Sequence, residues 1–281
     1  MKSPNVDMGN VSALFLTISL CVALMGFHNT AGAADWPNYR GPDHNGITKE
    51  TDWKTNWADS GPKVLWKKSI GIGFSSMAVV GGKVYAMGNQ GKKEDVVYCF
   101  DAVTGEEIWT HSYPCPLEPK YYEGGTLSTP TVDGDRVYTL SKMGSLFCLN
   151  AANGEIIWHK ELNKKMDYDL PTWHFSSSAL VVGDTIVLNI GDAGLALNKS
   201  TGETIWTNGK GKCGYATPVP FEMDGQRGLA IFGEDSIIAV SPYDGRKIWE
   251  FPWKTNYDVN AADPVIIDNY VFISSGYNRG C

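Results

Sequence analysis

Positively charged residues are few in this sequence, and their number bears on which classes of partner the protein can bind. The chain carries 24 Lys and Arg against 31 Asp and Glu, a formal net charge of −7. Binding to nucleic acid needs a basic surface that neutralises phosphates, so this balance argues against a nucleic-acid partner. Charged residues make up only 20% of the chain, which argues against a long disordered tail.

Cysteine motifs are also missing. None of the six cysteines belongs to a CxxC, a CxxCH or an adjacent Cys-Cys pair. A zinc site, a redox motif and an attached c-type haem therefore lack their usual spacing. The histidines after residue 34 share no metal-ligand spacing either. We predict no metal site and assign no catalytic residue.

Only one segment is apolar enough to insert into a membrane, and it lies at the N-terminus. Lys2 precedes an apolar run over residues 11–27, and small residues follow in Ala31-Gly-Ala33-Ala34. This order is typical of a signal peptide, cleaved here before Asp35. The run of about 17 residues is at the lower limit for a spanning helix, so a membrane anchor is the alternative. We predict a signal peptide over 1–34, no transmembrane span after its removal, and a periplasmic or secreted protein.

Glycine and aromatic residues are abundant, with 31 Gly, 13 Tyr and 10 Trp, and many of them recur at a fixed spacing. An eleven-residue pattern occurs four times. Each copy has a small residue ten positions before a Trp, Asp, Asn or Ser eight before it, and Gly four before it. The Gly and Trp of the four copies are Gly105 and Trp109, Gly154 and Trp158, Gly202 and Trp206, and Gly245 and Trp249. The tryptophans are 49, 48 and 43 residues apart, and Trp66 lies 43 residues before the first.

Each period holds four short strands separated by turn residues. The Gly of the pattern suits a hairpin turn that needs positive φ, and the Trp opens the last strand, where its ring can pack on the next repeat. Four strands in about 40–50 residues is the period of a β-propeller blade. A two-sheet sandwich, the alternative, does not predict identical motifs at a fixed period.

We therefore predict an all-β, incomplete β-propeller over residues 63–281, preceded by an N-terminal extension over 35–62. It has about four full blades and a partial fifth that starts at Pro264, and Val64–Trp66 is expected to be a lone fourth strand. The sequence stops after two strands of the fifth repeat, so we expect the propeller to be truncated at its C-terminus. Its uncovered blade faces are expected to promote aggregation.

The pattern A-x-D-x-x-T-G-x-x-x-W is the tryptophan-docking repeat, and from about residue 60 the chain resembles the PQQ-like, quinoprotein-type propeller family. Ala196–Trp206 matches the pattern with Asn for Asp. The opening Asp35–Pro42 and the ending Val271–Cys281 resemble a secreted bacterial subgroup typified by the outer-membrane assembly propeller.

The resemblance implies two functions. The first is a non-catalytic binding or scaffold module at the bacterial cell envelope, with a protein or saccharide partner and no cofactor. The alternative is a quinoprotein alcohol or sugar dehydrogenase that uses PQQ with calcium. Many such enzymes carry an adjacent cysteine pair or a haem motif, and this chain has neither, which favours the first function.

Several polar residues stand before the first strands of the repeats, where a propeller axis would bring them together. They are His174, Tyr215, Asp258, Asn260 and Asp263. Carboxylate and amide oxygens are ligands that calcium accepts, so these residues are weak candidates for a cofactor-binding cluster. The alternative is that they cap turns and solvate loops, which we favour.

Overall fold

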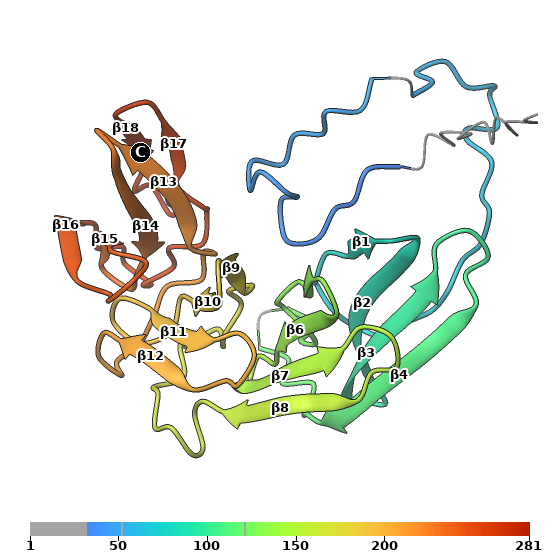
Figure 1. Ribbon diagram of the computed structural model, residues 1–281, viewed down its shortest axis with the longest axis horizontal. Helices are drawn as coiled ribbons and strands as arrows, with labels where there is room; N and C mark the ends of the chain where they lie inside the picture. Colours follow the sequence, from blue (N-terminus) through green and yellow to red (C-terminus); the bar gives the residue numbers. More distant parts are fainter. Residues whose placement is uncertain (1–32, 52, 121) are drawn as a thin grey trace, which may run out of the picture. The chain divides into compact units, whose positions relative to one another are not determined.

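The computed structural model describes residues 33–51, 53–120 and 122–281, and its regular elements are all β-strands (Figure 1). The predicted signal peptide falls, except for its last two residues, outside these ranges. No helix in the described part of the chain could cross a membrane.

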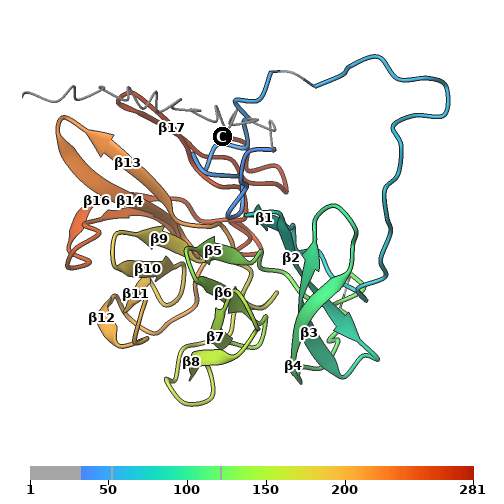
Figure 2. The same cartoon turned by 45° about the vertical axis from the view of Figure 1, so that its right-hand side comes forward.

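Four antiparallel sheets of four strands and one sheet of two strands follow one another along the chain, and we call each a blade. Within each sheet every strand pairs with its neighbour in sequence (Figure 2). The first two blades are β1 (Ala78–Val80), β2 (Lys83–Gln90), β3 (Glu94–Asp101), β4 (Glu107–Pro114), and β5 (Thr131–Asp133), β6 (Arg136–Leu140), β7 (Ser145–Asn150), β8 (Ile156–Glu161).

The third blade is β9 (Leu180–Val182), β10 (Thr185–Leu188), β11 (Leu195–Asn198), β12 (Thr204–Thr207). The fourth is β13 (Val219–Met223), β14 (Gln226–Phe232), β15 (Ser236–Val240), β16 (Lys247–Pro252). The partial fifth is β17 (Val265–Ile267) and β18 (Tyr270–Phe272). The predicted all-β fold, with four full repeats and part of a fifth, is therefore confirmed.

The repeated tryptophan of one blade docks on the repeated glycine of the next. The Trp109 ring lies so close to Gly154 that a Cβ there would stand 2.5 Å from a ring carbon, and Gly154 has φ +74°. The indole Nε1 of Trp109 donates a hydrogen bond of 3.1 Å to the carbonyl of Ala151. The same ring-on-glycine contact joins Trp66 to Gly105, Trp158 to Gly202, and Trp206 to Gly245.

The tryptophan of each of the four repeats has a small residue beside it in its own sheet. Trp109 pairs with Cys99 and Trp158 pairs with Cys148, in both cases at a register shift between the third and fourth strands. Ala196 and Ala239 hold the same place opposite Trp206 and Trp249. The small side chain leaves room for the ring, which explains the position ten before each tryptophan.

The cores lie between successive blades. In one cluster Leu180 and Val187 of the third blade pack with Leu229 and Ile231 of the fourth, all fully or almost fully buried. A single blade therefore cannot bury its own faces, and each blade is stabilised by its neighbours.

The expectation that Val64–Trp66 forms a strand is wrong. These residues have no strand partner in the described chain, and Val64 and Leu65 are exposed. A strand needs a neighbour that accepts and donates backbone hydrogen bonds. Trp66 docks without one, because its ring rests on Gly105 and its Nε1 donates to the Ala102 carbonyl at 3.0 Å.

Candidate functional site

Five residues, each two positions before the first strand of a blade, are linked by hydrogen bonds from blade to blade. The backbone N–H of Ser76 donates to Thr129 Oγ1 at 3.1 Å, and that of Thr129 donates to Ser178 Oγ at 2.9 Å. The N–H of Ser178 donates to Thr217 Oγ1 at 3.2 Å, and that of Thr217 to Asp263 Oδ1 at 2.9 Å. We call this set the inner ring. The side-chain oxygens of this ring therefore join the inner strands of neighbouring blades.

The inner ring lines a cavity of about 210 Å³. Aromatic side chains from other segments complete the lining, including Tyr39, Phe74 and Tyr215. Among its lining residues the cavity has one carboxylate, Asp263, and no His, Cys or Lys. This lining supplies hydroxyl groups and aromatic faces, which suit binding. Its carboxylate, Asp263, accepts the Thr217 N–H and pairs with Arg40.

The N-terminal extension crosses the inner ends of three blades next to this cavity. Trp36 forms a backbone bridge with Val79 of the first blade, and the Pro37 carbonyl accepts the N–H of Val132 in the second. Arg40 reaches Asp263 before the fifth blade, with 3.5 Å between Nη1 and Oδ2. The extension therefore forms part of the site and is more than a spacer.

Tyr215 and Asp263 are the two predicted candidates that line the cavity. Burial raises the pKa of Tyr215 to about 12, and its hydroxyl accepts the N–H of Trp173 at 3.3 Å. Burial also raises the pKa of the Asp263 carboxyl, whereas the Thr217 N–H and the Arg40 guanidinium lower it. Both polar groups are thus already engaged by the protein.

Asn260 is fully buried and serves the fold. Its amide Nδ2 donates to the carbonyls of Gly233, Glu234 and Trp253 at 2.9–3.3 Å, and its Oδ1 accepts from the Ser275 hydroxyl at 2.8 Å. These bonds use the side chain's donors and its oxygen. Asn260 therefore closes the loop between the fourth and fifth blades and is absent from the cavity lining.

His174 and Asp258 are not brought to the cavity either. Both have positive φ, 71° and 55°, which fits turns between blades. His174 is buried, and its burial lowers the pKa of the imidazole. The five candidates do not form one cluster, because Tyr215 and Asp263 alone line the cavity.

Two buried ionisable residues near the first two blades, Asp95 and Lys142, were missed by sequence reasoning. Asp95 and Lys142 are both fully buried. Asp95 accepts from Asn89 Nδ2 at 2.8 Å, and the Lys142 ammonium donates to the Leu117 carbonyl. Burial raises the pKa of Asp95 and lowers that of Lys142. No sequence signal separates Lys142, in Ser141-Lys142-Met143-Gly144, from the lysine of an exposed turn.

The residues at the axis do not fit a calcium-bound quinone. Calcium needs several free oxygen ligands. The Asn260 amide donates its hydrogen bonds to backbone carbonyls. The Asp263 carboxylate accepts a backbone N–H and pairs with an arginine. The described residues also contain no group of three His, Cys, Asp or Glu that could hold a metal ion.

Repeated four-stranded blades, joined by tryptophan docking and an inner ring of small residues, define a PQQ-like β-propeller. The fold resembles that of quinohemoprotein alcohol dehydrogenase from Comamonas testosteroni, with a TM-score of 0.56 at 15% identity over 82% of this chain and 43% of that one. BamB from Moraxella catarrhalis gives a TM-score of 0.49 at 20% identity, over 71% of this chain and 54% of that one.

The family follows from the sequence comparison. The family model for the outer membrane protein assembly factor BamB matches residues 92–281, and the chain belongs to this family. The outer membrane protein assembly factor BamB of Yersinia pestis is 27% identical over 241 residues, which cover 75% of this chain and 55% of the relative. The chain thus spans about half the length of that curated relative.

Proposed function

We propose that this protein is an exported, non-catalytic binding or scaffold propeller of the bacterial cell envelope. In this proposal residues 1–34 are a signal peptide, residues 35–62 an extension and residues 63–281 the propeller. The mature protein is periplasmic or secreted, and its partner is an envelope protein or saccharide. It needs no cofactor.

Family membership carries the proposal, since the related propeller from Yersinia pestis is named as an assembly factor and not as an enzyme. The cavity at the inner ring supports it. Its lining offers Tyr39, Phe74 and Tyr215 as aromatic contacts, and its one carboxylate, Asp263, is engaged by the Thr217 N–H and Arg40. We propose Tyr215 and Asp263 as the axial residues nearest the partner.

A quinoprotein dehydrogenase that uses PQQ and calcium is the second candidate, and the likeness of fold to a quinohemoprotein alcohol dehydrogenase motivates it. Fold alone does not assign an activity. The engaged side chains of Asn260 and Asp263 argue against it.

The test is site-specific photo-cross-linking in bacterial envelopes. A benzoylphenylalanine is placed at Phe74, which lines the cavity and is exposed, and in a matched control at Ile108, an exposed apolar residue on the outermost strand β4. We expect a discrete adduct with an envelope component from position 74 and none from position 108.

Calorimetric titration of the folded protein with PQQ and calcium is the second arm. We expect no saturable heat. Binding of PQQ near one to one would overturn the scaffold proposal in favour of the dehydrogenase. Oxidation of an alcohol by the PQQ-loaded protein, together with an absence of adducts at position 74, would also overturn it.

A further inference from the structure

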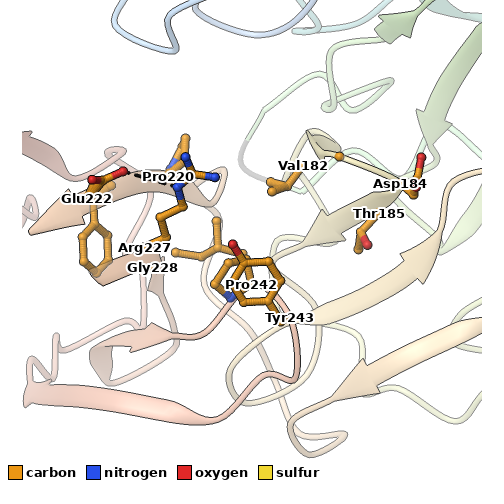
Figure 3. Close-up of a pocket in the computed structure, with 12 residues that line it drawn as sticks. Val182, Asp184, Thr185, Pro220, Glu222, Arg227, Gly228, Pro242 and Tyr243 are labelled. Carbon is orange, nitrogen blue, oxygen red and sulfur yellow. Dashed lines mark hydrogen bonds and ion pairs between the residues drawn. The ribbon is translucent and has the colours of Figure 1, made fainter. Parts of the chain in front are cut away.

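The largest cavity of the described chain is a cleft of about 660 Å³ between the third and fourth blades. Figure 3 shows that its charged side chains Glu222 and Arg227 bind each other, with 3.3 Å between Oε2 and Nε. Both are exposed, and none of the polar side chains that line this cleft is buried. Solvent therefore reaches its polar groups, and size alone does not identify a ligand site here.

The smaller cavity at the inner ring differs, because three of its hydroxyl side chains are buried. Thr129, Ser178 and Thr217 line it and are 3%, 3% and 8% exposed. Each hydroxyl oxygen accepts a backbone N–H of the preceding blade, at 3.1, 2.9 and 3.2 Å. No hydrogen bond between described residues uses the three hydroxyl protons. These protons are therefore available to an acceptor inside the cavity.

The charge of the lining narrows the kind of acceptor. Seven hydroxyl side chains and one carboxylate, Asp263, line the cavity, and no lysine or histidine does. Arg40 lies outside the lining and is paired with Asp263. An anion would meet a carboxylate without a free cation beside it, and a cation would meet mainly hydroxyl donors. The lining therefore suits an uncharged ligand that is rich in oxygen acceptors.

Aromatic rings supply the apolar part of the same lining. Phe74 is 56% exposed, and its ring packs edge-on against Tyr122, with 5.6 Å between the ring centroids. Tyr39 and Tyr215 add two more rings. Aromatic faces pack well against C–H groups, whereas the buried hydroxyls bind oxygens. A pyranose ring carries both kinds of group, since its C–H bonds form a face and its hydroxyls project from the edge.

The N-terminal extension holds Tyr39 in this lining from both sides. Before it, Trp36 exchanges two backbone hydrogen bonds with Val79, at 2.7 and 2.9 Å. After it, Arg40 pairs with Asp263. A tyrosine from outside the blades is thus fixed beside the buried hydroxyls, and the cavity has an aromatic wall that the repeats do not supply.

We propose that the cavity at the inner ring binds a single uncharged pyranose ring of an envelope glycan. This inference rests on the proposed function, since it names the partner of the same cavity. The sugar oxygens accept the protons of Thr129, Ser178 and Thr217, and the C–H face packs on Phe74. The volume of about 210 Å³ lies below the roughly 300 Å³ at which pockets for drug-sized ligands begin, so one ring enters and the rest of the glycan stays outside.

The test is saturation-transfer NMR of the folded protein with the methyl glycosides of glucose, galactose, mannose and N-acetylglucosamine. We expect transfer to the ring C–H protons of at least one of them. The methyl glycosides of glucuronic and galacturonic acid are the matched charged controls for glucose and galactose. They should bind roughly tenfold more weakly than their neutral counterparts, because their carboxylate meets that of Asp263.

Phe74→Ala should weaken glycoside binding roughly tenfold, through loss of the aromatic face. Tyr243→Ala, at an exposed aromatic residue in the turn between β15 and β16, is the matched control and should leave binding unchanged. An unchanged affinity in Phe74→Ala would overturn the sugar site, as would equal affinities of the neutral and charged glycosides.

An absence of transfer from every glycoside would also overturn the sugar site. Binding of N-acetylglycinamide in place of the glycosides would overturn it in favour of a peptide. A cross-linked protein at position 74 without glycoside binding would overturn the sugar site and leave the scaffold function, whereas binding of PQQ near one to one would overturn the scaffold function itself.

Discussion

The contact between Trp109 and Gly154 is the clearest single-residue determinant of this fold. Gly154 combines a left-handed backbone with a ring packed where a side chain would begin. Gly134, in the turn between β5 and β6, has φ +59° and open space around it. Substitution of Gly134 by Ala therefore measures the cost of backbone strain alone. Substitution of Gly154 by Ala measures that cost together with the cost of displacing the ring.

We expect Gly134→Ala to lower the free energy of unfolding by roughly 1–2 kcal/mol, the penalty of the left-handed region for a residue with a Cβ. Gly154→Ala should lose about 1–3 kcal/mol more, because the added methyl group must displace the Trp109 ring. Denaturant unfolding of both variants measures the difference. Equal losses would mean that ring docking contributes little to stability.

At the scale of the element, the inner ring joins the first strands of neighbouring blades. The link between Thr129 and Ser178 is buried at both ends. Ser178→Ala leaves the Thr129 N–H without its acceptor, and a buried unsatisfied donor costs about 1–3 kcal/mol. Ser200, in an exposed turn, is the matched control, and Ser200→Ala should change stability by less than about 0.5 kcal/mol.

Denaturant unfolding measures both serine variants, and hydrogen exchange of the Thr129 amide adds a local readout. Exchange at that amide should become faster in Ser178→Ala alone. An unchanged rate would show that the hydroxyl is not the acceptor that protects this amide.

At the scale of the whole molecule, apolar surface on the two-stranded sheet favours self-association. Ile267 and Phe272 are more than half exposed, and two-stranded sheets are marginally stable alone. We expect residues 35–281 to self-associate as concentration rises in sedimentation velocity. Ile267→Lys should reduce the association, whereas Ile108→Lys on β4 should not. A cooperative monomer at every concentration would contradict this expectation.

The sequence by itself determined the blade period and the strand order. Those follow from local chemistry, since Gly105, Gly154 and their equivalents mark turns that need positive φ, and the tryptophans recur at a fixed distance from them. The resemblance to the PQQ-like family followed from the same residues. The strand expected at Val64–Trp66 failed because strand formation depends on a partner, which local sequence does not reveal.

The site was decided by tertiary structure. Asn260 and Asp263 are three residues apart, yet one is buried among backbone carbonyls and the other faces the cavity. The inner ring joins segments from different blades, and the Arg40 contact joins the N-terminal extension to the segment before the fifth blade. Their geometry depends on how neighbouring blades pack, and that is a long-range property that no single repeat carries in its own sequence.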